Sequence, residues 1–340
     1  MKKHKHKMRM TRSERLFRSL LILTITCASL WGVWNILVSK PAIANNTPPG
    51  KTLSINKDDV AAVADAVNSS AQEEEPEEDS LYARRDNCWT FLLIGMDKGG
   101  GNTDSLMLAT YDVDKQAVGV ASIARDTRVD VDRKLKKINA AYALNGGVPG
   151  VMEEVSRTFG VPIDFYLRVN LRGFIRLVDA VGGVDFYVPC SMNYDDPEQG
   201  LSIHYSKGMC HLSGQQAMEV CRFRQNNDGS GYGDGGRQET QRGVLTAVVR
   251  KALANPGKLN EYAAIASENL DTNLTASNIA WFATKAVSFD MENLHAVSMP
   301  CSWHSPYMYL DPAATLEVVN EYLNPYVLPR TADQLDIITR

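Results

Sequence analysis

A single uncharged segment constrains this chain more than any other feature. Residues 19–38 form a run of 20 residues without a charged side chain. At ~1.5 Å of rise per residue, a helix of that length spans the hydrocarbon core of a bilayer. Trp31 and Trp34 lie toward its C-terminal end, where amphipathic aromatic side chains favour the membrane–water interface. We therefore predict one transmembrane helix over residues 19–38.

The charges that precede this segment predict its orientation. Residues 1–18 carry eight lysines and arginines against one glutamate, a net charge of +7. Positively charged flanks stay on the cytoplasmic side, so residues 1–18 form a cytoplasmic basic tail and the chain after Val38 lies outside the cell membrane. The alternative is a cleaved signal peptide, for which residues 42–44 (Ala-Ile-Ala) provide a small-residue site. The apolar run exceeds the ~7–15 residues usual in such signals, which favours an uncleaved anchor.

The exported part divides into a linker and a domain. Residues 39–87 include the acidic run EEEPEED at 73–79, and so polar a segment cannot bury enough apolar surface to fold alone. We predict a disordered acidic linker over 39–87 and an extracytoplasmic domain over 88–340. Because the whole chain carries −4 and residues 1–18 carry +7, the remainder carries −11. Such an acidic body excludes a nucleic acid as the expected partner.

Strand-like and helix-like segments alternate from Cys88 onward. Short apolar runs rich in β-branched residues predict strands, and apolar residues with a 3.6-residue period predict helices. Interleaving of this kind predicts an α/β layered fold with a mixed central β-sheet flanked by helices. The predicted strands cover 91–95, 106–113, 117–124, 164–170, 184–189 and 295–300, and the predicted helices cover 137–144, 149–159, 171–181, 213–220, 237–254, 277–287 and 312–323.

Five cysteines follow the predicted anchor, and their spacing does not match a zinc site. A disulfide is permitted outside the cell. Cys190 and Cys210 flank one excursion of the chain and are the best candidate pair. The odd count leaves at least one free thiol, and Cys221 is suited to be a small buried hydrophobe.

One loop concentrates positive charge in this acidic domain. Residues 222–242, RFRQNNDGSGYGDGGRQETQR, contain four arginines and five glycines. Alternation after the preceding helix directs Arg222 and Arg224 to one face. Arg237 and Gln241 are four apart on the next helix, and their face continues into its apolar, core-facing side. We therefore expect these groups to point inward beside a helix N-terminus, which attracts anions.

Convergent guanidinium groups repel one another unless an anion lies between them, and their forked donors match phosphate oxygens. The glycines would let the backbone come close to that anion. The alternative is a set of internal salt bridges to Asp228, Asp234 and Glu239. We favour the anion site, and the sequence leaves the alternative open.

A second group of polar residues lies upstream. Asp97 and Asp104 are seven apart across the glycine-rich GMDKGGGNTDS, which follows the strand-like FLLIG. Hard carboxylates at adjacent strand ends suit Mg²⁺, which takes one or two carboxylates and leaves other positions to water and substrate phosphate. Two turn-forming aspartates are an equally good interpretation.

A third segment, SIARDT, ends a strand at Arg125 and Asp126, and KINAAYA follows from Lys137. Metal-binding carboxylates, an arginine cluster and a membrane anchor together indicate phosphoryl transfer on a diphosphate carried by a lipid.

In this order, the segments resemble the LytR–CpsA–Psr family, enzymes that attach glycopolymers to peptidoglycan in Gram-positive envelopes. The resemblance covers about residues 88–255 clearly and the rest of the domain more loosely, and it implies the family's layered fold. The motifs that carry it are FLLIGMD, NTDSLMLATYDV, SIARDT, KINAAYA, VNLRGFIRLVDAVGGVDFYVP and RFRQNNDGSGYGD.

The resemblance assigns roles to the matching residues. Mg²⁺ would bind Asp97 and Asp104. Catalytic roles fall to Arg125, Asp126 and Asp234; the last two are candidate bases, although Asp126 could instead orient Arg125. The residues expected to bind pyrophosphate are Arg125, Lys137, Arg222, Arg224, Arg237 and Gln241.

Two positions depart from the family's pattern. Ala124 stands where a proline usually precedes the Arg-Asp pair. Thr240 stands where many members carry a further arginine, and Arg242 is the nearest replacement in the chain.

The implied substrate is a polyprenyl pyrophosphate-linked glycopolymer. Its lipid would lie between the sheet and the helix over 171–181, against the apolar stripe Phe174, Leu177, Val178 and Val181, although ordinary core packing explains the same stripe. A peptidoglycan hydroxyl would attack the diphosphate. A non-catalytic polyprenyl-phosphate binder and a pyrophosphatase are the alternatives. A transcriptional attenuator is disfavoured because the predicted cytoplasmic part is only 18 residues long.

Overall fold

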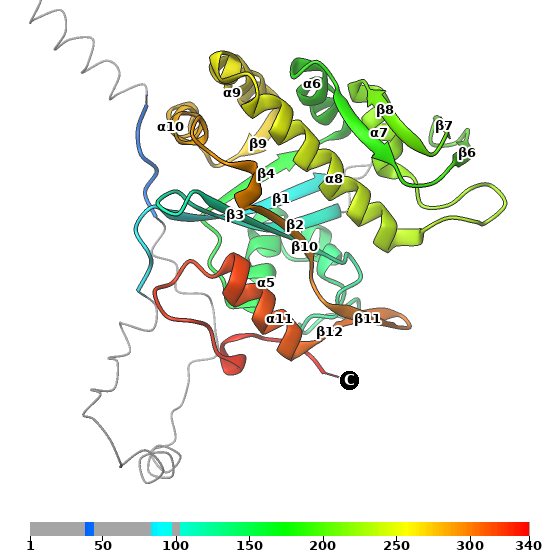
Figure 1. Cartoon of the computed structure of the whole chain (residues 1–340). Helices are drawn as coiled ribbons and strands as arrows, with labels where there is room; N and C mark the ends of the chain where they lie inside the picture. Colours follow the sequence, from blue (N-terminus) through cyan, green and yellow to red (C-terminus); the bar gives the residue numbers. More distant parts are fainter. Residues whose placement is uncertain (1–37, 44–82, 97–102, 340) are drawn as a thin grey trace, which may run out of the picture.

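The computed structural model describes residues 38–43, 83–96 and 103–339. Its centre is a mixed six-stranded sheet with the strand order β10-β3-β2-β1-β4-β9 (Figure 1). β1 pairs with β4, and β3 with β10, in parallel, and the other neighbours are antiparallel. The strands are β1 (Cys88–Met96), β2 (Thr103–Asp112), β3 (Ala117–Ile123), β4 (Phe165–Val169), β9 (Leu270–Thr272) and β10 (Leu294–Ser298).

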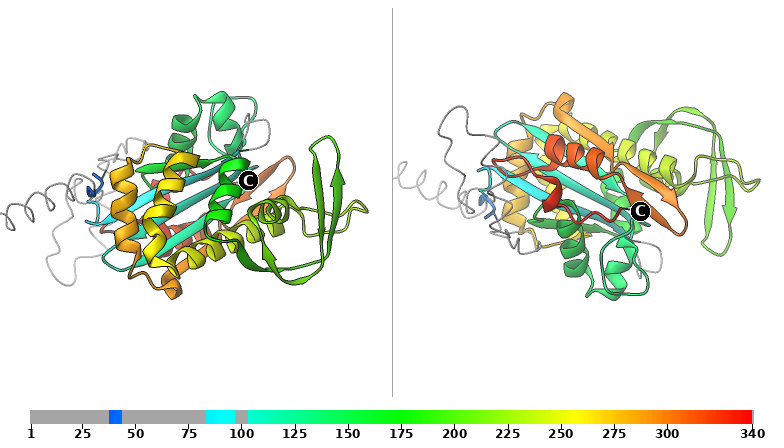
Figure 2. Two further views of the ribbon diagram at one scale, coloured as in Figure 1. Left: turned by 90° about the horizontal axis from the view of Figure 1, so that it is seen from above. Right: turned by 90° about the horizontal axis from the view of Figure 1, so that it is seen from below.

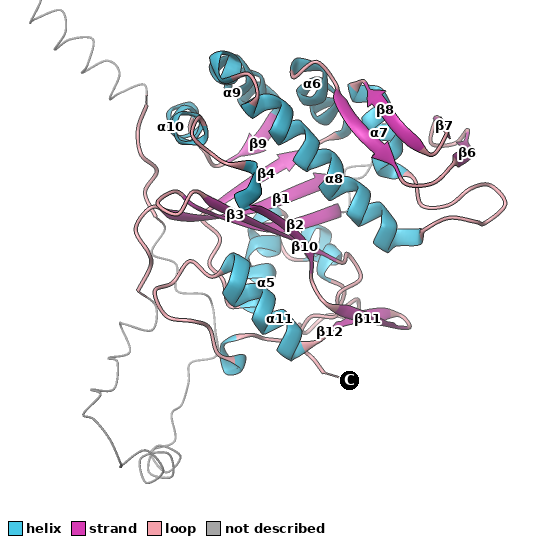
Figure 3. Cartoon of the chain, in the orientation of Figure 1, coloured by secondary structure: helices cyan, strands magenta, loops and turns pink. Residues whose placement is uncertain are grey.

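Helices cover both faces of this sheet (Figure 3). Successive side chains of a strand point to opposite faces, so Leu92 and Ile94 pack in the core on one face, while Phe91 and Leu93 pack on the other. The first face lies against α5 (Val148–Phe159) and α11 (Pro312–Val318), and the second lies against α8 (Gly233–Leu253), α9 (Leu259–Asn269), α10 (Ala276–Ala286) and α6 (Leu171–Ala180).

Hairpins extend the molecule at one end of the sheet (Figure 2). β5 pairs with β8, β6 with β7, and β11 with β12, each antiparallel. The remaining elements are α4 (Ala141–Leu144), β5 (Val184–Val188), β6 (Met192–Asp196), β7 (Leu201–Tyr205), β8 (Gly208–Leu212), α7 (Gly214–Arg222), β11 (Cys301–His304) and β12 (Tyr307–Leu310).

The α/β layered fold with a mixed central sheet is confirmed. The predicted strand over 184–189 is β5, but the other hairpin strands and α9 were not predicted, because strands such as β6 (Met192–Asp196) are short, polar and half exposed and show no apolar run. Two helix ends also differ from the prediction. α7 continues to Arg222, and α8 begins at Gly233, one turn before Arg237.

Residues 19–37 of the predicted membrane anchor lie outside the described residues, as does the cytoplasmic tail over 1–18. Across residues 38–43, 83–96 and 103–339, no helix combines the length and apolar character that crossing a membrane requires.

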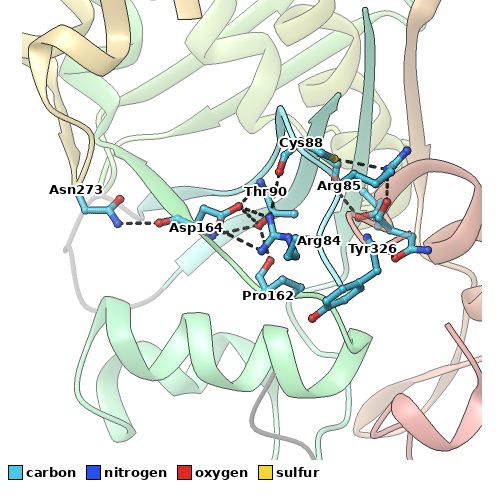
Figure 4. Close-up of polar contacts among 11 residues, drawn as sticks. Arg84, Arg85, Cys88, Thr90, Pro162, Asp164, Asn273 and Tyr326 are labelled. Atoms are coloured by element: carbon cyan, nitrogen blue, oxygen red, sulfur yellow. Dashed lines mark hydrogen bonds and ion pairs between the residues drawn. The ribbon is translucent and has the colours of Figure 1, made fainter. Parts of the chain in front are cut away.

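Both described ends of the predicted linker contact the domain. Arg84 donates to Asp164 at 2.8 Å and to the carbonyl of Cys88 at 3.1 Å (Figure 4). Arg85 pairs with Asp112 at 2.7 Å. Nearer the predicted anchor, the side chain of Asn278 donates to the carbonyl of Ser39 at 3.1 Å. The folded part therefore begins before Cys88.

These contacts predict how a shortened chain behaves. A chain beginning at Leu81 keeps Arg84 and Arg85 and should unfold cooperatively, with a loss of about 1 kcal/mol from the missing contacts of residues 38–43. A chain beginning at Asp86 leaves the buried Asp164 without Arg84 and should lose about 3 kcal/mol or more. Thermal melting of the two chains checks the difference. Non-cooperative melting of the longer chain would place the domain boundary upstream.

The candidate disulfide is wrong. Cys190 and Cys210 are both free thiols. Cys210 pairs with Phe186 in the β5–β8 ladder, four residues before Cys190 along the chain. β5 ends at Val188, so Cys190 lies beyond the ladder in which Cys210 takes part. Cys221 is free and buried, as expected, and burial raises its pKa to about 12.

Candidate active site

An apolar cavity of about 290 Å³ lies between the sheet and helices α6 and α8. Leu93 and Met107 contribute from the sheet, and Leu245 and Val248 contribute from α8. Asp104, Arg222, Arg237 and Gln241 also line it, so an apolar cavity carries a strongly polar group of side chains.

The α6 stripe contributes three of its four predicted members to this cavity. Phe174, Leu177 and Val178 line it. Val181 lies instead in the core that α6 forms with α7 and the hairpins. Val178 is fully buried in that same core, so one residue both lines the cavity and packs the domain.

Two carboxylates lie among arginines next to the cavity's polar end, where Asp104 and Arg237 line the cavity and Arg125, Arg224 and Asp234 do not. Asp104 pairs with Arg125 at 3.3 Å and with Arg224 at 3.8 Å. Asp234 pairs with Arg237 at 2.7 Å and with Arg224 at 3.5 Å. Three guanidinium groups thus surround two carboxylates. Of the internal salt bridges considered as the alternative to an anion site, those to Asp234 are present.

Arg224 and Arg237 differ sharply in their surroundings. The side chain of Arg237 is 3% exposed, and it also donates to the backbone carbonyl of Asp104 at 3.2 Å, which ties α8 to β2. The side chain of Arg224 is 39% exposed and its two ion pairs are long. Burial, followed by repulsion from Arg237 and Arg125, lowers the pKa of Arg224. The positive charge of Arg224 is therefore incompletely compensated by the protein.

Asp234 is held as a carboxylate. Burial opposes its ionisation, but the charge of Arg237, a hydrogen bond from Gln238 and the charges of Arg224 and Arg125 outweigh burial and lower its pKa. A carboxylate with a lowered pKa is a weak proton acceptor. This arrangement disfavours Asp234 as a general base and favours it as the group that positions Arg237.

The glycines of the loop close it on itself. The amide of Gly233 donates to the carbonyl of Arg224 at 2.9 Å, and Gln225 bridges to Gly231. Gly231 has a φ of +152°, and a Cβ there would lie 2.6 Å from the Arg224 carbonyl oxygen. At this position the small residue lets the loop return beside Arg224, whereas the sequence predicted an approach of the backbone to an anion.

Arg222 lies at the cavity but faces a hairpin. Its guanidinium donates to the side chain of Gln199, in the turn between β6 and β7, at 2.6 Å. Gln199 was not predicted as a site residue, because only the tertiary fold brings this hairpin to the arginines. The hairpin is fixed in turn by the loop, since the side chain of Asn226 accepts from the amide of Asn193 at 2.6 Å.

Gln241 supplies a polar group with unused capacity. Its Nε2 donates to the carbonyl of Cys221 at 3.2 Å. Its Oε1 is buried and has no hydrogen-bond partner within the described ranges. Buried acceptors are rarely left unpaired, so this oxygen fits a ligand that carries a hydrogen-bond donor.

The position of the further family arginine is closed off. Thr240 is 3% exposed, and its hydroxyl donates to Tyr232 at 3.2 Å. Arg242 does not line the cavity.

Asp126 and Lys137 form a pair of their own. The Lys137 Nζ lies 3.0 Å from an Asp126 carboxylate oxygen, and each side chain is 22% exposed. The amide of Thr127 donates to the carbonyl of Ala124 at 3.0 Å, so Arg125 and Asp126 are the two central residues of a tight turn. Asp126 is bonded to Lys137, and the structure gives it no role in orienting the Arg125 side chain.

The residues present fit a bound Mg²⁺. Asp104 offers a hard carboxylate oxygen within the arginine cluster, where a phosphate would also bind. Asp97, the other expected ligand, lies outside the described residues. Among the residues that are described, no group of three His, Cys, Asp or Glu side chains forms a closed metal site. A site of one or two carboxylates completed by substrate and water is the arrangement usual for Mg²⁺.

An arginine cluster at an apolar cavity, set on a mixed sheet, defines a class of site that suits an amphipathic anion. The chain belongs to the LytR_cpsA_psr family, whose profile matches residues 55–324.

Its relatives include a polyisoprenyl-teichoic acid–peptidoglycan teichoic acid transferase, TagU, from Bacillus mycoides. The two are 34% identical over 245 residues, which cover 68% of this chain and 77% of TagU. The crystal structure of Bacillus subtilis TagV shares the fold with a TM-score of 0.60 and 28% identity, covering 72% of this chain and all of TagV. TagT bound to LI-WTA shares the fold with a TM-score of 0.57 and 20% identity, covering 76% and 95% of the two chains.

Proposed function

We propose that this protein transfers a glycopolymer from a polyprenyl pyrophosphate carrier to a sugar hydroxyl of peptidoglycan. The observation that carries the proposal is one cavity with two chemistries. Apolar side chains from the sheet, α6 and α8 line its body, and Arg237, Arg222 and Asp104 line its polar end. A ligand with a long apolar tail and a diphosphate matches both. The names of relatives such as TagU support the same reaction class.

The reaction is a substitution at phosphorus. The acceptor hydroxyl oxygen bonds to the phosphorus that carries the polymer, and the bond from that phosphorus to the bridging oxygen breaks. Polyprenyl monophosphate leaves, and the hydroxyl proton passes to a base. Arg125, Arg224 and Arg237 would donate to the non-bridging oxygens, where negative charge is concentrated, so positioning and charge stabilisation would supply most of the acceleration.

Asp97 and Asp104 would hold Mg²⁺, which when bound neutralises charge on the diphosphate. Asp126 is the better candidate for the base. The carboxylate of Asp234 already accepts hydrogen bonds from Arg237 and Gln238. Among the described residues, Asp126 forms one ion pair, with Lys137. Lys137 would then position the Asp126 carboxylate and would not bind the pyrophosphate.

The proposal is tested with the full-length protein, a synthetic polyprenyl pyrophosphate-linked polymer and nascent peptidoglycan. Transfer requires polyprenyl monophosphate and polymer-bearing peptidoglycan to appear in equal amounts. Monophosphate release without polymer attachment would identify a pyrophosphatase, and binding without turnover would identify a lipid-phosphate binder. Either result overturns the proposed transfer.

The proposed location is the cell membrane, with the N-terminus cytoplasmic and the domain outside. The +7 charge of residues 1–18 before a single 20-residue uncharged run supports this orientation. Protease added to intact protoplasts should remove the domain, while protease added to cells with intact walls need not reach it. Full protection of the domain in protoplasts would reverse the proposed topology.

A further inference from the structure

The β11–β12 hairpin continues directly from the candidate active site. The strand-like segment over 126–128 pairs with β12, since the amide of Met308 donates to the Asp126 carbonyl at 2.9 Å and the amide of Arg128 donates to the Met308 carbonyl at 2.8 Å. Lys137 bridges to Arg128 on the opposite edge. Residues around Lys137, the segment over 126–128 and the hairpin thus form one small sheet.

The register divides this small sheet into two faces. Thr127 pairs with Met308 in a parallel bridge, and Cys301 of β11 pairs with Leu310 of β12. Thr127 and Leu310 are buried, which makes theirs the inner face beside the domain, although Trp303, which pairs with Met308 on that same face, is 55% exposed. The alternate positions form the outer face, which carries Asp126, Arg128, Lys137, His304, Tyr307 and Tyr309.

The outer face is a group of aromatic rings beside polar groups. The rings of Tyr307 and Tyr309 lie 6.4 Å apart between centroids, and those of His304 and Tyr309 lie 5.9 Å apart. The Arg128 guanidinium lies 5.6 Å from the Tyr307 centroid. Arg128 bridges in turn to Lys137, which forms the ion pair with Asp126.

We propose that this outer face binds the glycan strand of peptidoglycan that accepts the polymer. The inference rests on the proposed function. A pyranose ring presents a face of C–H bonds that packs on an aromatic ring, while its hydroxyls bond polar tips such as those of Tyr, Arg and Lys. A glycan on this face places a hydroxyl beside Asp126, the candidate base, one residue from Arg125 of the arginine cluster.

Tyrosine, arginine and lysine also suit a membrane surface, but the position of the hairpin disfavours that partner. Residues 38–43, which follow the predicted anchor, contact α10 and β1 through Ser39 and Lys40. Figures 1 and 2 show this segment at the end of the molecule opposite the hairpin. The outer face therefore lies far from the predicted membrane entry and toward the wall.

The test measures glycan binding apart from transfer. Uncrosslinked, polymer-free glycan strands are titrated into the full-length protein in nanodiscs without any lipid diphosphate. The Tyr307→Ala/Tyr309→Ala protein should bind glycan about tenfold more weakly. Tyr309→Phe, which keeps the ring, should bind within about threefold of wild type. Tyr187→Ala removes a tyrosine on β5 that is 51% exposed and should have no effect.

Unchanged glycan affinity in the double variant would overturn the inference even if wild-type transfer is intact. If the double variant binds glycan normally but loses binding to phosphatidylglycerol vesicles, the outer face is a membrane contact, and the inference is also overturned. If the double variant does not fold, hydrogen exchange of the wild type decides. Glycan should protect residues 301–310, and absence of protection there counts against the inference. The binding measurement contains no lipid diphosphate. It therefore tests the glycan site even if the proposed transfer reaction proves wrong.

Discussion

Replacing Arg224 with alanine is expected to weaken binding of a short-chain polyprenyl pyrophosphate by about 2 kcal/mol, or ~30-fold, the contribution of one charge-assisted hydrogen bond. The free energy of unfolding of the ligand-free protein should change by less than about 1 kcal/mol. The side chain is 39% exposed, and its ion pairs to Asp104 and Asp234 are 3.8 and 3.5 Å long. Burial, followed by repulsion from Arg237 and Arg125, lowers its pKa. Removing the Arg224 side chain should therefore change the stability of the ligand-free protein little, while the bound diphosphate loses one positively charged partner.

Arg237→Ala provides the contrast. The sequence analysis placed both arginines in one anion site, but the structure gives them different surroundings. Arg237 is 3% exposed, bonds Asp234 at 2.7 Å and reaches the Asp104 carbonyl. Its loss should lower the free energy of unfolding by about 2 kcal/mol or more, since Asp234 and that carbonyl lose their donor.

The measurement pairs thermal melting with titration of each variant. Arg224→Ala should melt near wild type and bind poorly. If it melts much lower than wild type yet binds the diphosphate normally, the arginines serve to hold the loop, and the assignment of the anion site fails.

Asp104→Asn is expected to reduce Mg²⁺-dependent turnover by about 100-fold or more. The amide keeps the size of the carboxylate but removes its charge and its affinity for a hard cation. More Mg²⁺ should be needed for half-maximal rate. The domain should remain folded, because the side chain is 37% exposed.

Asp104 also pairs with Arg125 and Arg224, so a control must separate metal binding from arginine pairing. Asp234→Asn supplies it. The Asp234 side chain is similarly exposed, at 39%, and also pairs with Arg224. It should reduce turnover without changing the Mg²⁺ requirement. An equal shift in both variants would attribute the effect to the charge of the cluster, and an unchanged Mg²⁺ requirement in Asp104→Asn would make Asp104 a partner of the arginines only.

Part of the candidate site followed from local pattern. The four-residue spacing of Arg237 and Gln241 predicted that both face inward, and both line the cavity. The apolar stripe on α6 predicted Phe174, Leu177 and Val178 as lining residues. Periodicity reports which face of a helix is buried, and here that face borders a cavity.

Other features depended on contacts between segments far apart in the chain. The ion pair of Asp126 with Lys137, the bond from Arg222 to Gln199 and the return of the loop at Gly231 join parts of the chain whose meeting has no local signal. The same is true of Arg84, which lies in a stretch read as linker but pairs with the buried Asp164.

Hydrophobic periodicity and segment length are local properties of the chain, so the alternation of strands and helices and the family motifs could be recognised without the structure, and the membrane anchor stays a prediction. The charges around Asp234, the different burial of Arg224 and Arg237, and the aromatic face beside Asp126 became known only from the tertiary structure. Those properties depend on which side chains approach within a few ångströms, and such distances are set by the packing of the sheet, its helices and its hairpins.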